Sequence, residues 1–338
     1  MRNFKDYLFI YLKGIAMGSA DVVPGVSGGT IAFISGIYDE LIQSISNIKP
    51  ALFKDILKGN FKEVWQKVNG NFLVVLLAGI ATSILSLAKL ITFLLQYYPI
   101  QLWSFFFGLI IASIFYVGKQ IKKWNLGSIL GIILGTIAIF YVSTMPPLAA
   151  QSSYLYLFLS GALAACAMIL PGISGSFILL LLGAYTTIIS AIGNHEIGTI
   201  AVVVLGSGIG LLSFSKLLNY LLEKHHNTLV GVLTGFLIGS LWKIWPWKIN
   251  ETVYIKDHGE KLMSELSPNY KSLSVYLQEQ SSESFSKINS LIESNISPSM
   301  YTLANASAEN HLISAIAFGV FGFLIIFIIE YIAKSKNV

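Results

Sequence analysis

The five-residue pattern Pro-Gly-x-Ser-Gly occurs twice, at Pro24–Gly28 and at Pro171–Gly175, and each copy interrupts a long apolar stretch. Proline and glycine both weaken or break helices. Inside a membrane, a broken backbone is tolerated only where other protein segments or a water-filled cavity surround it. Paired breaks at corresponding places in two halves of a chain are typical of the binding site of a secondary transporter. The repeated break therefore narrows the folds that this chain can adopt.

The composition is that of a membrane protein. Of the 338 residues, 54% are hydrophobic and 12% are charged, whereas about 25% of the residues in a soluble domain are charged. The apolar stretches are also longer than the alternating segments of about 10 residues that build a membrane β-barrel. The sequence therefore predicts an all-α polytopic membrane protein. The net charge of +5 gives no indication of nucleic-acid binding.

The repeat extends beyond the motif. A shift of 147 positions places Gly14–Ile45 on Gly161–Ile192 with many identical residues, among them both copies of the motif. A shift of 127 positions places Lys89 on Lys216 and Gly108 on Gly235. Two apolar helices share scattered matches by chance, but lysines and glycines in register indicate an internal duplication.

The distribution of lysines predicts the topology. The loop 46–70 carries five lysines against Asp55 and Glu63, and residues 119–123 carry three more. Cytoplasmic loops are enriched in lysine and arginine, so both loops and both chain termini are predicted to be cytoplasmic. The segments beside each break are short compared with the roughly 20 residues of a full span. Each half is then predicted to form a re-entrant helical hairpin plus three transmembrane helices, with the second half inverted.

The apolar stretches set the predicted boundaries. The first repeat covers 1–147, with the hairpin at 8–46 and helices at 72–96, 101–118 and 126–145. The second repeat covers 148–338, with the hairpin at 152–193 and helices at 198–222, 228–247 and 311–333. A polar external insertion, 248–310, precedes the last helix and includes the helical-looking stretch Lys271–Ile292.

A second topology also agrees with the lysine distribution. If the segments beside the breaks are full spans, the chain has ten transmembrane helices and a parallel repeat. The loops 46–70 and 119–125 then still lie on one side. The first apolar stretch, 8–20, is short for a span, which favours the hairpin.

The motif itself offers neutral groups that bind anions. Glycines open backbone conformations that are closed to other residues, and backbone N–H groups at the start of a helix attract negative charge. Two helix starts that meet near the membrane midplane would bind a phosphate or carboxylate. The alternative is that proline and glycine only permit close helix crossing. The candidate residues are Gly25, Ser27, Gly28, Gly29 and Thr30 in the first copy and Gly172, Ser174, Gly175 and Ser176 in the second.

Four further candidates lie outside the motif. Ser19 and Asp21 directly precede the first break, and a carboxylate inside a membrane marks a functional site by default. Asp21 could carry a proton, bind a cation, pair with a lysine or cap the broken helix, and its counterpart in the second copy is Met168. Lys89 and Lys216 lie about three-quarters along their helices. They could attract a phosphate near each membrane face or extend towards the interface.

Enzymatic alternatives lack essential groups. A serine nucleophile of the intramembrane-protease type needs a base within hydrogen-bond reach, and no histidine lies at membrane depth inside a predicted span, since His311 is at the very end of its helix. Membrane undecaprenyl-diphosphate phosphatases carry an arginine after the motif serine, where this chain has Gly28 and Gly175. Arg2 is the single arginine, so the electrostatic stabilisation of pyrophosphate hydrolysis is missing. We therefore expect no catalytic residue, no metal site and no cofactor.

The motif residues resemble a known family. The stretch Gly18-Ser-Ala-Asp-Val-Val-Pro-Gly-Val-Ser-Gly-Gly-Thr30, with Pro171-Gly-Ile-Ser-Gly-Ser176 in the second half, is similar to the bacterial polyprenyl-phosphate transporter family. The resemblance covers nearly the whole chain apart from the insertion 248–310. It implies a flippase that returns undecaprenyl phosphate from the outer to the inner leaflet of the cytoplasmic membrane. The partners that it implies are this lipid carrier and the surrounding membrane lipid.

The sequence leaves three functional readings. The first is the lipid-phosphate flippase, in which coupling to a proton or cation gradient through Asp21 is a further hypothesis. The second is a secondary transporter of a small water-soluble anion, and the third is a membrane polyprenyl-diphosphate phosphatase. The expected binding groups of the flippase are the serines and threonine of both motifs together with Lys89 and Lys216.

Overall fold

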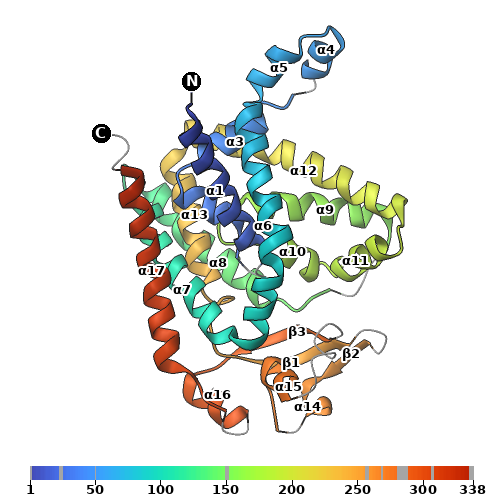
Figure 1. Cartoon of the computed structure of the whole chain (residues 1–338), viewed down its shortest axis with the longest axis vertical. Helices are drawn as coiled ribbons and strands as arrows, with labels where there is room; N and C mark the ends of the chain where they lie inside the picture. The colour runs from blue at the N-terminus through green and yellow to red at the C-terminus, as the bar shows by residue number, and fades with distance from the viewer. Residues whose placement is uncertain are drawn as a thin grey trace. The chain divides into compact units, whose positions relative to one another are not determined.

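The computed structural model describes residues 2–22, 26–49, 51–148, 152–255, 259–267, 269–279, 288–305 and 308–334. The chain is mostly helical (Figure 1). It divides into two compact units. Unit 1 consists of Met1–Ala88 and Ser113–Ser240, and unit 2 consists of Lys89–Ala112 and Leu241–Val338. Each unit combines segments from both predicted repeats, so the units do not correspond to the repeats.

Unit 1 contains both motifs. Its elements are α1 (Phe4–Val22), α2 (Gly28–Ile34), α3 (Tyr38–Ser46), α4 (Ala51–Leu57), α5 (Phe61–Lys67), most of α6 (Gly70–Tyr97), the end of α7 (Pro99–Gly118), α8 (Leu126–Thr144), α9 (Tyr154–Ile169), α10 (Gly175–Leu181), α11 (Tyr185–Gly193), α12 (Ile197–Lys224) and α13 (His226–Ser240).

The boundaries of these helices repeat along the chain. Helices α2 and α10 have seven residues each, α3 and α11 have nine, and α6 and α12 have 28. The offsets between them are the 147 and 127 positions found in the sequence. Gly36 and Gly183, which follow α2 and α10, share a positive φ of 72° and 64°, a conformation that glycine adopts without strain. The duplication is therefore visible in element lengths and turns, while the inverted orientation of its second copy stays a prediction.

Four helical segments of the described chain are long and apolar enough to cross a membrane. They are Gly70–Leu87, Pro99–Gly118, Leu126–Thr144 and Ile197–Lys224. Helices α10 and α11 form a pair bent by 106°, which is either a fifth, broken span or a re-entrant loop. These helices make the chain a multi-pass membrane protein.

The helix predicted at 228–247 is shorter in the structure. Helix α13 ends at Ser240, and residues 241–244 form turns. Pro246 follows this turn, and a proline disfavours helical backbone at the residue before it. The apolar pattern continues past the turn because Trp242, Trp245 and Trp247 lie there, and hydropathy alone does not distinguish aromatic turn residues from a helix.

Small residues bring the membrane helices of unit 1 close together. Helices α8 and α13 approach so closely that a Cβ added to Gly135 would lie 2.6 Å from the carbonyl oxygen of Val232. Helices α9 and α12 pack in the same way, because a Cβ added to Gly161 would lie 2.6 Å from the carbonyl oxygen of Val203. Close backbone approach is how helices associate in lipid. The second pair holds α9, which ends at the second motif, against α12.

The predicted external insertion folds mainly as a sheet. In unit 2, β1 (Lys248–Ile255) pairs antiparallel with β2 (Gly259–Leu262) and with β3 (Ile288–Asn295), in the order β2-β1-β3. Val253, Met263 and Leu273 form its small core. The remaining helices of unit 2 are α14 (Met263–Leu266), α15 (Leu273–Glu279), α16 (Pro298–Ala304) and α17 (Leu312–Lys334).

The all-α prediction is therefore wrong for this segment. The stretch Lys271–Ile292 was predicted to be helical, but among its described residues, 271–279 and 288–292, α15 is the helical part and β3 occupies the end. Strand β1 reads Lys-Ile-Asn-Glu-Thr-Val-Tyr-Ile, and its β-branched and aromatic residues favour a strand. Once β1 forms, pairing along its edge overrides the weak helical pattern of β3.

Candidate functional site

The two motifs lie directly against each other in unit 1. The Ser27 hydroxyl is 3.1 Å from the carbonyl oxygens of Met168 and of Leu170, at the end of α9. The backbone N–H of Gly172 donates to the Thr30 hydroxyl at 3.0 Å. Ser27 and Thr30 are fully buried. The two breaks, 147 positions apart, thus form one continuous structure, as the paired motif predicted.

The hydroxyls of the first motif hold this contact together. Besides facing α9, the Ser27 oxygen accepts the N–H of Gly29 at 3.1 Å and caps the start of α2. The Thr30 oxygen is occupied by the N–H of Gly172. Their predicted part in phosphate binding stays a prediction, because in this arrangement both hydroxyls join the two copies. Gly25, the remaining candidate of the first copy, lies outside the described residues.

Asp21 closes the first break. One of its carboxylate oxygens accepts the backbone N–H of Gly28 at 2.6 Å, so the end of α1 is tied to the start of α2. A Cβ on Gly28 would lie 2.5 Å from the other carboxylate oxygen, which explains the glycine at this position. Of the roles considered for Asp21, the geometry places it as a cap on the broken helix, where a negative charge is favourable.

The second break has no equivalent cap. The counterpart of Asp21 is Met168, and Ser174, which precedes α10, makes no capping hydrogen bond with its side chain. The hydroxyls of Ser174 and Ser176 instead hydrogen-bond to each other at 2.7 Å. Within the described part of the chain, they make no other hydrogen bond. Ser174 and Ser176 are therefore the candidate hydroxyls that remain free to exchange their partner for a ligand.

The other predicted residues lie apart from this contact. The Ser19 hydroxyl is 2.9 Å from the carbonyl oxygen of Ile15 and 2.9 Å from the hydroxyl of Ser83, so it joins α1 to α6. Lys89 is the twentieth residue of α6 and Lys216 the twentieth of α12, and both are exposed. Lys216 belongs to unit 1 and Lys89 to unit 2. Their predicted attraction for a phosphate stays a prediction.

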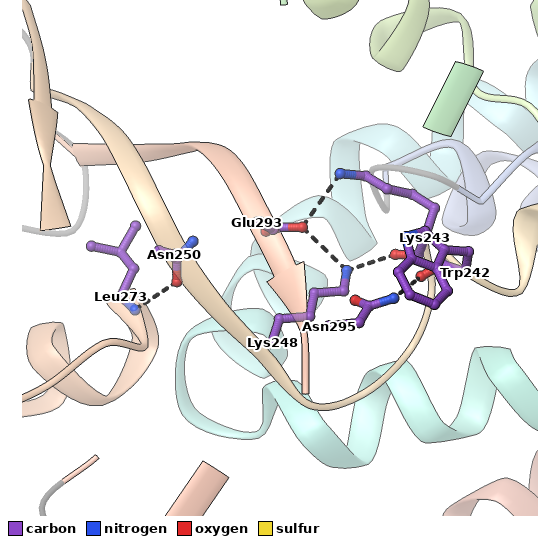
Figure 2. A network of polar contacts seen from close by, with 7 residues as sticks. All are labelled: Trp242, Lys243, Lys248, Asn250, Leu273, Glu293 and Asn295. Atoms are coloured by element: carbon purple, nitrogen blue, oxygen red, sulfur yellow. Dashed lines mark hydrogen bonds and ion pairs between the residues drawn. The ribbon is translucent and has the colours of Figure 1, made fainter. Parts of the chain in front are cut away.

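A charged network in unit 2 was missed by the sequence analysis. Figure 2 shows the ammonium groups of Lys243 and Lys248 converging on the carboxylate of Glu293, each at 3.3 Å. The Lys248 ammonium also donates to the carbonyl oxygen of Lys243 at 2.6 Å and lies 4.1 Å from the centroid of the Trp103 ring. The three side chains are only 9–23% exposed. The sequence signals lysines and acids here, but not which of them pair.

This network adjoins an aromatic cavity. The Asn295 amide donates to the carbonyl oxygen of Trp242 at 2.6 Å and holds the end of β3 against the turn after α13 (Figure 2). The cavity beside it has a volume of about 460 Å³. It is lined by Phe107, Leu241, Trp242, Trp245, Asn295, Ile296 and Ser297. Trp242 and Trp245, which follow α13, therefore line one site in unit 2.

A comparison with protein families identifies the chain. The model of the undecaprenyl phosphate translocase-like family matches residues 17–262, a range that includes both motifs. The chain belongs to the undecaprenyl phosphate translocase-like family. The match ends with β2, so α15, β3 and α17 lie beyond the segment that the family model covers.

Two proteins named polyprenyl-phosphate transporters are similar to the chain along most of its length. One, from Vibrio cholerae serotype O1, is named a polyprenyl-phosphate transporter and is 47% identical over 266 residues, which cover 78% of this chain and 86% of the relative. A protein of the same name from Staphylococcus aureus is 33% identical over 270 residues, which cover 72% of this chain and 91% of the relative. No solved structure matches the chain.

Proposed function

We propose that this protein is a flippase that returns undecaprenyl phosphate from the outer to the inner leaflet of the bacterial cytoplasmic membrane. The names of the two relatives supply the substrate class. The observation that carries the proposal is the contact between the two helix breaks, because non-helical backbone buried among membrane helices is where transporters bind their substrates. In the proposed orientation both termini and the loop 46–70 face the cytoplasm.

The substrate phosphate is proposed to bind at the second break. Ser174 and Ser176 would donate their hydroxyls to its oxygens, because the comparable groups of the first break are occupied by Asp21 and by α9. The polyprenyl tail would remain in the lipid. Lys216 and Lys89 would attract the phosphate near opposite faces, and inverted halves would move against each other to alternate access. No bond is made or broken in this cycle, so the protein is proposed not to be an enzyme.

The proposal predicts that removing both hydroxyls slows transport. Labelled polyprenyl phosphate is incorporated into liposomes with the wild type or with the double variant Ser174→Ala/Ser176→Ala. A hydrogen bond to a charged group contributes roughly 1.5–3 kcal/mol, so we expect transport to fall by at least about tenfold. The control is Ser213→Ala, because the Ser213 hydroxyl bonds to the carbonyl oxygens of Ile209 and Gly210 in its own helix.

Three outcomes would contradict the proposal. Equal rates for the double variant and the wild type would remove the serines from the site. Transport of inorganic phosphate in place of the lipid would favour the small-anion transporter. Release of phosphate from a polyprenyl diphosphate by the purified protein would favour the phosphatase.

Coupling to an ion gradient is proposed to depend on Asp21. In the variant Asp21→Asn, the amide oxygen still accepts the N–H of Gly28, so the cap remains while the titratable charge is lost. An imposed pH gradient is expected to change the transport rate of the wild type at least severalfold and to leave that of the variant unchanged. A gradient response of equal size in both proteins would exclude Asp21 as the coupling group.

A further inference from the structure

Two short helices between α3 and α6 expose both apolar and basic side chains. Helix α4 ends at Leu57 and α5 begins at Phe61, so the pair forms a helical hairpin, which we name the α4–α5 hairpin (residues 51–67). Figure 1 shows it projecting beyond the first residues of α6. It belongs to unit 1 and is remote from the contact between the motifs.

The hairpin presents large apolar side chains to its surroundings. Leu57 is 73% exposed, Phe61 is 65% exposed and Trp65 is 47% exposed. Phe61 and Trp65 are four residues apart on α5, so they lie on one face of that helix. Single exposed apolar residues are ordinary, but a contiguous exposed group marks a surface that contacts a partner or a membrane.

The fold fixes the depth of this surface relative to the membrane. The indole N–H of Trp65 donates to the side-chain oxygen of Asn71 at 2.8 Å, and the Trp65 ring packs against Gly70. Gly70 is the first residue of a membrane-spanning segment, Gly70–Leu87. The Trp65 ring is thus held where that span begins, which is the level at which tryptophan is enriched in membrane proteins.

The charge of the hairpin selects one kind of membrane surface. Lys67 is neutralised by Asp55 at 3.1 Å and by Glu63 at 3.0 Å. Lys54, Lys58 and Lys62 are exposed and form no ion pair with any residue in the described ranges. With four lysines against two carboxylates, residues 51–67 carry a net charge of +2 beside an apolar face, which is the pattern of a segment that binds anionic lipid.

We propose that the α4–α5 hairpin lies on the membrane surface and binds anionic lipid. Leu57, Phe61 and Trp65 insert at the boundary between head groups and acyl chains. Lys54, Lys58 and Lys62 contact the acidic head groups. The site is independent of the transported lipid and of which leaflet the hairpin faces, so it does not depend on the proposed transport function.

The test places a spin label on the apolar face of the full-length protein. The variant Leu57→Cys, in a Cys166→Ser background, leaves Phe61 and Trp65 intact. The labelled protein is reconstituted in nanodiscs of pure phosphatidylcholine or with one-third phosphatidylglycerol. We expect the label to collide severalfold more with oxygen than with a water-soluble nickel complex when phosphatidylglycerol is present. A label at Gln66→Cys, which points away from Phe61, is the matched control and stays accessible to the nickel complex.

The lysines are tested in the same system. In the triple variant Lys54→Gln/Lys58→Gln/Lys62→Gln, the label at position 57 is expected to collide with the water-soluble nickel complex even when phosphatidylglycerol is present. A Leu57 label that is open to the nickel complex in both lipids would overturn the proposal. A label that is shielded from both reagents would also overturn it, because that result indicates a protein partner. Lipid contact that depends neither on phosphatidylglycerol nor on the lysines would overturn it as well.

Discussion

Replacing Gly29 by alanine is expected to separate the two motifs and to abolish most transport. The added Cβ would lie 2.8 Å from the carbonyl oxygen of Ile169 and 3.1 Å from that of Met168. Both atoms belong to the backbone, so no side chain can move aside. Overpacking of this kind costs about 1–3 kcal/mol, and here the strain falls on the contact that Ser27 and Thr30 maintain. A cost of about 2 kcal/mol corresponds to roughly 30-fold, so we expect transport in liposomes to fall by at least about tenfold.

The control for Gly29→Ala is Gly208→Ala. Gly208 lies within α12, and a Cβ there would meet no atom within 4 Å. Alanine is the better helix former, so this variant should keep wild-type transport and thermal stability. If Gly29→Ala transports at the wild-type rate while its folding is unchanged, the motif contact has no role in transport.

The meeting of the two breaks could be predicted because it depends on local chemistry that is repeated. Proline and glycine interrupt a helix wherever they occur, and the duplication indicates that both interruptions serve one purpose. The detailed use of the hydroxyls could not be predicted. Whether Ser27 faces a ligand or the end of α9 depends on the packing of α9 on α12, through contacts such as Gly161 on Val203, which no local pattern encodes.

Asp21 shows how far a single residue can be interpreted from sequence. A carboxylate at membrane depth indicates a functional site, and capping of the broken helix was one of its predicted roles. The structure adds the partner, the N–H of Gly28. It also shows what accompanies Met168 at the second break, where, among the described residues, two serine hydroxyls hydrogen-bond only to each other. That difference appears only when both helix starts are compared in space.

The polar segment after α13 was the least predictable part of the fold. Its strands are short, and β3 pairs with β1 across more than 30 residues of chain. Such pairing is decided by tertiary contacts rather than by propensity. Lys243 lies inside the helix predicted at 228–247, whereas in the structure it follows α13 and shares Glu293 with Lys248. Long-range ion pairs of this kind leave no signal in a single sequence.

Replacing Glu293 by glutamine is expected to loosen the sheet of unit 2. Burial alone would raise the pKa of the Glu293 carboxyl, but the ammonium groups of Lys248 and Lys243 outweigh burial and lower this pKa well below 4.5. Burial lowers the pKa of Lys248 to about 8, although Glu293 opposes this shift. Glutamine would remove the negative charge that the two neighbouring ammonium groups share. Breaking a buried ion pair in this way costs about 3–5 kcal/mol, and partial exposure reduces the expected cost to about 2 kcal/mol.

Hydrogen exchange of the β1 and β3 amides measures this effect, and 2 kcal/mol corresponds to a loss of protection of roughly 30-fold at pH 7. Because the folded-state pKa of Glu293 is lowered, its contribution is present above about pH 4.5 and is lost as the pH falls further. The difference between wild type and variant should therefore shrink in acid.

The control Glu251→Gln removes an exposed carboxylate of β1 that bonds to Ser294, and we expect it to change little. In the triple variant Lys243→Met/Lys248→Met/Glu293→Leu, protection should recover, because apolar side chains replace all three charges of the network. Equal protection in Glu293→Gln and wild type would show that the network does not stabilise the sheet.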